Sequence, residues 1–88
     1  MVSTQEGTGP VVAQAPLVWR STLRGVLVLD DEARLLQGLG AAVWIALADG
    51  PLAPDDVHRD LQSWGMDADR DQLESAIAAL VDAGLLVS

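Results

Sequence analysis

The sequence has no cysteine, no phenylalanine and no tyrosine. Without cysteine the chain has no disulfide, no thiolate metal ligand and no cysteine nucleophile. This usage fits a reducing compartment. The N-terminal residues lack the basic start and long apolar run of a signal peptide, and no apolar run in the sequence is long enough to span a bilayer. We therefore expect a cytoplasmic protein with no membrane partner.

Positive charge is scarce. Thirteen acidic residues stand against five basic ones, all of them arginine, and the formal net charge is −8. A field of this sign repels phosphate backbones and anionic lipid. It favours a basic or neutral partner, although solubility alone explains such a charge equally well.

The 88 residues are enough for one small domain, and half of them are hydrophobic. A domain of this size has little room for a deep substrate cavity, so a binding module is a better expectation than an enzyme. The only aromatic residues are Trp19, Trp44 and Trp64. The core must therefore be mainly aliphatic.

Residues 1–16 carry scattered glycine and proline and show no periodic pattern. We predict a flexible tail over this range and a folded domain over residues 17–88. The first part of that domain has a strand pattern. Residues 17–23, 26–29 and 33–36 are rich in strand formers and are separated by short polar turns, which predicts a three-stranded antiparallel meander.

Three helix patterns follow, over about residues 39–48, 54–64 and 69–83. The first helix has a weak N-cap, whereas Asp69 and Gln72 form a capping-box-like start to the third. Residues 85–87 should return over the core as a short extended segment. The predicted fold is an α+β domain, a three-stranded antiparallel sheet followed by three helices, with a winged-helix-like topology.

A search for catalytic or metal-binding patterns finds little. The single histidine, His58, lies off the apolar stripe of the second helix and has no nucleophile-elbow serine nearby, so we expect a solvated side chain. The acids of residues 30–32 are typical of a solvated turn. Asp67, Asp69 and Asp71 lack the glycine and glutamate of a calcium loop. We predict no catalytic residues, no metal and no cofactor.

Nucleic-acid binding is also disfavoured. A recognition helix needs basic side chains. The third helix has only Arg70 against Asp69, Asp71, Glu74 and Asp82, so phosphate would repel it.

The backbone offers another kind of chemistry. Residues 33–36 would form the edge strand of the predicted sheet, and an edge can accept an extended peptide as an added strand. The third helix could form the other wall of a groove beside it. The opposite interpretation is an edge blunted by its shortness and by Arg34. Spacing alone does not choose between the two.

The order of several short segments adds a family resemblance. Residues 26–30 (VLVLD), then residues 36–44 (LQGLGAAVW), Asp49-Gly50, and a closing Leu80 followed by residues 83–86 (AGLL) resemble the signature of the PqqD-like family. The likeness covers about residues 17–87. Gln37 and Leu39 depart from the family pattern, which usually has Asn and a capping Ser or Thr there.

The resemblance implies a standalone recognition element that holds the leader region of a ribosomally synthesised precursor peptide. It implies a modifying enzyme as a second partner, such as a radical-SAM protein, a protease or a cyclase. The leader would add as a strand beside the third strand, and the implied contacts are Ala33, Arg34, Leu35 and Leu36 on the strand, with Arg70, Leu73, Glu74, Ile77 and Val81 on the third helix. Leu73 and Ile77 fit a plain core role equally well.

Two alternatives remain open. A divergent winged helix could mediate protein–protein contact without binding a leader peptide. A small enzyme subunit would need His58 for activity, which we do not expect. An exposed edge could also pair with a second copy, giving a homodimer.

Overall fold

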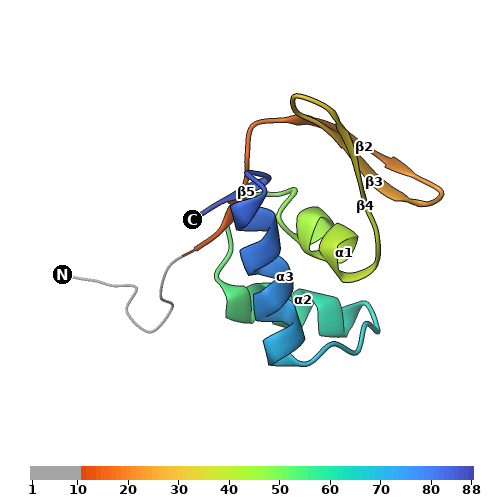
Figure 1. Cartoon of the computed structure of the whole chain (residues 1–88). Coiled ribbons are helices and arrows are strands. Elements are labelled where there is room, and N and C mark those ends of the chain that lie inside the picture. The colour runs from red at the N-terminus through yellow and green to blue at the C-terminus, as the bar shows by residue number, and fades with distance from the viewer. Residues whose placement is uncertain (1–10) are drawn as a thin grey trace.

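The computed structural model describes residues 11–88. Three consecutive strands lead into three helices, and a short strand lies at each end of the described chain (Figure 1). The strands are β1 (Ala13–Gln14), β2 (Val18–Thr22), β3 (Gly25–Leu29), β4 (Ala33–Leu36) and β5 (Leu86–Val87), and the helices are α1 (Gly38–Ala46), α2 (Pro54–Ser63) and α3 (Arg70–Asp82). The predicted α+β order is confirmed. The likeness to a winged helix stays a prediction.

The main sheet is antiparallel, with β3 between β2 and β4. Val28 lies opposite Trp19 on β2 and Arg34 on β4. Residues directly opposite one another share a face of the sheet, so these side chains point to the same side. Val26 and Val28 are fully buried, which identifies this side as the inner face, packed against α1.

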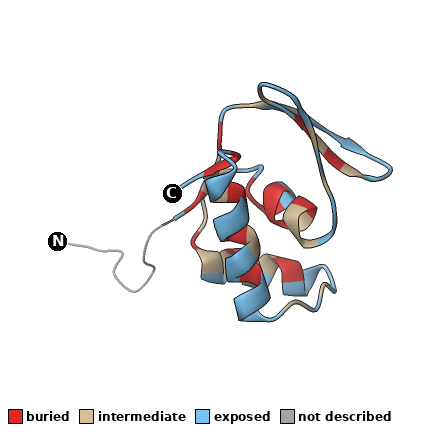
Figure 2. Cartoon of the chain, viewed as in Figure 1, coloured by how far each residue is buried: buried red, intermediate tan, exposed pale blue. Residues whose placement is uncertain are grey.

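The core lies between the inner face of the sheet and the three helices, and the buried positions line the facing sides of the helices (Figure 2). Trp44 of α1 is fully buried, as are Leu61 of α2 and Leu73 of α3. The other buried residues are Val, Leu, Ile and Ala, so the core is aliphatic apart from one indole. No helix in the described part of the chain has the length and apolarity needed to cross a membrane.

The helix ends agree with the local sequence. Asp69 accepts the backbone N–H of Gln72 at 2.9 Å, and the Gln72 side chain accepts the N–H of Asp69 at 3.2 Å, so the predicted capping box is confirmed. Gln37 precedes α1 and gives it no side-chain cap, as predicted. The helices end slightly earlier than the predicted ranges, since Leu47 and Trp64 are C-cap residues.

The predicted flexible tail is wrong for residues 12–15. Val12 exchanges backbone hydrogen bonds of 2.8 and 3.0 Å with Leu52, and β1 pairs antiparallel with β5. Val12 and Ala15 are buried, so the segment covers part of the core. Its partners lie far along the chain, which is why no local pattern marks it. Residues 1–10 of the predicted tail lie outside the described residues.

Candidate peptide-binding surface

The third strand of the sheet, β4, is an edge strand. It pairs with β3 on one side, and no strand among residues 11–88 pairs with its other side. Arg34 and Leu36 share the inner face with Val28 and Val26, whereas Leu35 shares the outer face with Leu27. The backbone of β4 is thus placed to pair with a further strand, but its side chains alternate between two different surroundings.

Polar contacts fix the turn that leads into β4. Asp30 accepts the backbone N–H of Glu32 at 3.0 Å and the Nε–H of Arg34 at 3.2 Å. The Glu32 N–H, and after it the charge of Arg34, hold the pKa of the Asp30 carboxyl below its usual value. Arg34 is also 4.0 Å from the Glu32 carboxylate, so its charge is already compensated within the chain.

A hollow of about 590 Å³ opens where β4 leads into α1. One wall is Leu39, in the first turn of α1, and the other comes from the loop before α3 and the first turns of that helix. The lining residues are Leu39, Met66, Asp67, Ala68, Asp71, Gln72 and Ser75. Asp67 and Asp71 make no ion pair with any described residue. The hollow therefore combines the apolar side chains of Leu39, Met66 and Ala68 with uncompensated negative charge.

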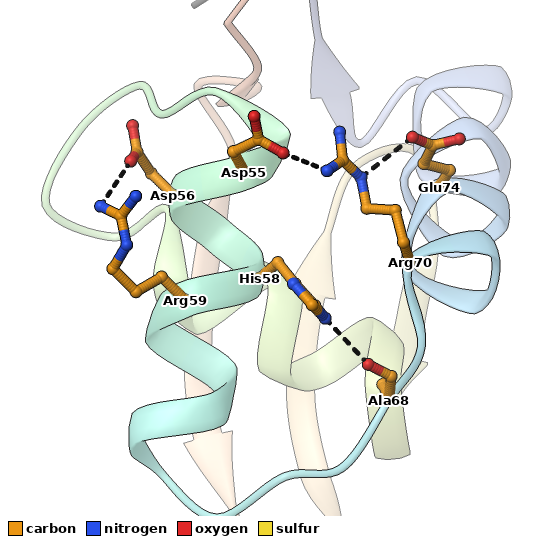
Figure 3. A network of polar contacts seen from close by, with 7 residues as sticks. All are labelled: Asp55, Asp56, His58, Arg59, Ala68, Arg70 and Glu74. Carbon is orange, nitrogen blue, oxygen red and sulfur yellow. Dashed lines mark hydrogen bonds and ion pairs between the residues drawn. The ribbon is translucent and has the colours of Figure 1, made fainter.

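His58 supports one wall of this hollow. Its Nε2 lies 3.0 Å from the carbonyl oxygen of Ala68 (Figure 3), and the side chain is half-buried. This bond ties α2 to the loop before α3. The histidine predicted to be solvated is thus only partly exposed and is held by the loop before α3.

The residues predicted on α3 are not all available to a groove. Leu73 and Ile77 are buried in the core, with 0% and 7% of their surface exposed. Arg70 donates to Asp55 of α2 and, at 3.0 Å, to Glu74 (Figure 3). It is therefore engaged within the chain.

The remaining predicted side of α3 faces a different hollow. Glu74, Ile77 and Val81 line a depression of about 340 Å³ together with Val12 and Pro54. That depression adjoins α2 and the N-terminal segment. Of the wall residues predicted on α3, Leu73 is excluded by its full burial. Arg70, Glu74, Ile77 and Val81 do not line the hollow at the start of α1, and their contact with a leader stays a prediction.

The part of α3 that lines the larger hollow is polar. It consists of Asp71, Gln72 and Ser75, which lie within about one helical turn of one another. An apolar stripe on a helix is the usual sign of a contact surface, but the apolar stripe of α3 packs into the core of the domain itself. The polar residues gave no comparable signal in the sequence.

Residues suited to catalysis or metal binding do not gather at either hollow. No polar or charged residue is buried within residues 11–88. Over the same range, no three His, Asp or Glu side chains are grouped as metal ligands would be.

Comparisons of the chain with protein-family models, with curated proteins and with solved structures find no match.

Proposed function

We propose that the chain is a non-catalytic recognition element for the leader region of a ribosomally synthesised precursor peptide. The leader lies along β4 as an added antiparallel or parallel strand and continues over the hollow at the start of α1. One observation carries the proposal, namely the unpaired edge of β4, whose C-terminal end leads into the helix that lines an open hollow with Leu39. The residue pattern shared with the PqqD-like family is its second support.

The physical basis of recognition is the usual one for strand addition. Backbone N–H and C=O groups of β4 supply affinity, and alternate side chains of the leader supply specificity. An apolar leader side chain fits against Leu39, Met66 and Ala68. Asp67 and Asp71 favour a neutral or basic neighbour over an acidic one.

The chemistry takes place on a second protein. In this proposal the domain presents the bound leader, in the cytoplasm, to a modifying enzyme such as a radical-SAM protein, a protease or a cyclase.

Titration of the full chain with the leader of the precursor encoded beside its gene tests the proposal. We expect calorimetric binding, with amide shifts concentrated in β4 and in the first turns of α3. Ser75→Trp should abolish binding because the new side chain fills the hollow. Ala78→Trp is the matched control, since Ala78 is exposed on the same helix but lines the other depression.

The proposal fails if no binding occurs at high micromolar peptide. It also fails if Ala78→Trp blocks binding while Ser75→Trp does not. Binding of the modifying enzyme without any binding of the leader would instead support a protein–protein interaction module.

A further inference from the structure

The outer face of the main sheet carries an apolar patch. Val18, Leu29 and Leu35 are 70%, 45% and 43% exposed, and Leu27 is half-buried among them. The strand register places these residues together, because Val18 lies opposite Leu29, and Leu27 lies opposite Leu35. Single exposed apolar residues are ordinary, but a contiguous group marks a contact surface.

This patch is uncovered because the helices lie on the other side of the sheet (Figure 2). Only the inner face packs against α1, through Val26 and Val28. A three-stranded sheet with one layer of helices keeps its second face in solvent unless another molecule covers it.

Charge is distributed unevenly between this sheet and the rest of the chain. Residues 17–36, which contain the sheet, have three arginines and three acids. The whole chain has thirteen acids and five bases, so the remaining ten acids and two bases account for the entire net charge of −8. Apart from Glu6, these charged residues fall within residues 49–82, so most of the charge that would repel a second copy lies outside the sheet.

The charges of the sheet are also arranged by position along the strands. Arg24 lies in the turn between β2 and β3, and Arg20 faces outward on β2. The acids Asp30, Asp31 and Glu32 occupy the turn at the opposite end of β3, with Arg34 beside them. Arg24 thus makes the turn at one end of the sheet positive and the three acids make the turn at the other end negative, while Arg20 lies in the middle of β2.

We propose that the outer face of the sheet binds a second copy of this chain. The two sheets pack face to face around a two-fold axis that reverses the strand direction. Each positive turn then lies over the negative turn of the other copy, and the apolar patches meet between them. A two-fold contact needs such a self-complementary surface, and the two acidic helical layers point away from each other.

This arrangement differs from pairing of two β4 edges, since it buries side chains and leaves both edges open. It does not depend on the proposed leader binding, because the leader would use the edge and the inner side. Each copy in the dimer could hold its own peptide.

Sedimentation equilibrium of the full chain over a range of concentrations tests the proposal, and we expect a monomer–dimer equilibrium. Leu35→Glu should raise the dissociation constant roughly a hundredfold or more, because the change removes apolar contact from both copies. Ile45→Glu is the matched control, since Ile45 has a similar exposure of 41% but lies on α1. Circular dichroism checks that both variants keep the fold.

A charge exchange tests the orientation of the two sheets. Arg24→Glu should weaken the dimer, since each new carboxylate faces the acidic turn of the other copy. Adding Asp31→Arg to the same chain should restore it. A chain that stays monomeric at every concentration would overturn the proposal, and so would a dimer that Leu35→Glu leaves intact.

Discussion

Trp19 on β2 packs against Trp44 on α1, with the ring centroids 6.0 Å apart and the ring planes at 82°. This edge-to-face pair joins the sheet to the helical layer. Trp44 has no exposed surface, and Gln14 donates to its carbonyl oxygen at 2.8 Å. The sheet, α1 and the N-terminal segment therefore meet at one residue, and the position of β4 relative to the helices depends on that packing.

Replacement of Trp44 tests this role. Trp44→Ala should cost about 3–5 kcal/mol of unfolding free energy, through lost transfer and a cavity. The indole Nε1 of Trp44 is buried and has no hydrogen-bond partner among the described residues. Trp44→Phe removes this unpaired donor with part of the ring, so its cost should be clearly smaller. Urea unfolding followed by circular dichroism measures both, and equal costs would contradict the prediction.

Gly25 is essential to the pairing of β3 with β4. Its φ is +151°, and a Cβ there would lie 2.0 Å from the carbonyl oxygen of Leu36. Gly25→Ala should therefore displace the end of β4, lower the unfolding free energy and weaken leader binding. Gly40→Ala is the control, because nothing lies within 4 Å of its added Cβ. Within α1 that change should stabilise the protein by about 0.5–1 kcal/mol.

The lowered pKa of Asp30 predicts an acid sensitivity of the turn before β4. A carboxyl whose pKa is lower in the folded than in the unfolded chain stabilises the fold above the unfolded value, near 3.8. That contribution is lost as the pH falls through the lowered value. Titration of the Asp30 carboxyl carbon by NMR should give a pKa below 3.8, and a value at or above it would contradict the prediction.

Arg34→Met separates the two causes of this shift. The backbone N–H of Glu32 is the larger cause and the Arg34 charge a smaller one. The variant should raise the pKa of Asp30 only partly, leaving it below its ordinary value. A complete return to that value would show that Arg34, and not the turn, determines the titration.

His58→Ala should loosen the loop before α3. The carbonyl of Ala68 loses its 3.0 Å partner, at a cost of about 1 kcal/mol. Amide hydrogen exchange should accelerate at Met66, Asp67 and Ala68. Arg59→Ala is the control, since it breaks only an exposed ion pair with Asp56 and should leave exchange in the loop unchanged.

The sequence was sufficient for the elements whose signals are local. The apolar run of β3, the capping box at Asp69 and the glycines that follow α2 and α3 depend on neighbouring residues, and all appear where expected. Helix α1 ends at Ala46, before the predicted stop at Gly50. The strand order β2-β3-β4 was also predicted correctly, because two short turns leave few other ways to arrange three strands.

Features that depend on contacts between residues far apart in the chain could not be predicted from local sequence patterns. Val12 pairs with Leu52, forty residues further along the chain. No residue pattern near Val12 indicates this pairing. The side of α3 that faces the hollow was also missed. Its apolar residues pack inward, while Asp71 and Ser75 resemble any solvated positions in sequence.

Pairing of β1 with β5 has a practical consequence for work with shortened versions of the protein. A version starting at residue 17, where the recognisable strand pattern begins, would leave Leu85 and Leu86 without the backbone and side chains that now cover them. Such a fragment would present fresh apolar surface and an unsatisfied strand. Precipitation of that fragment would then reflect the loss of the pairing between β1 and β5, and not a low stability of the full domain.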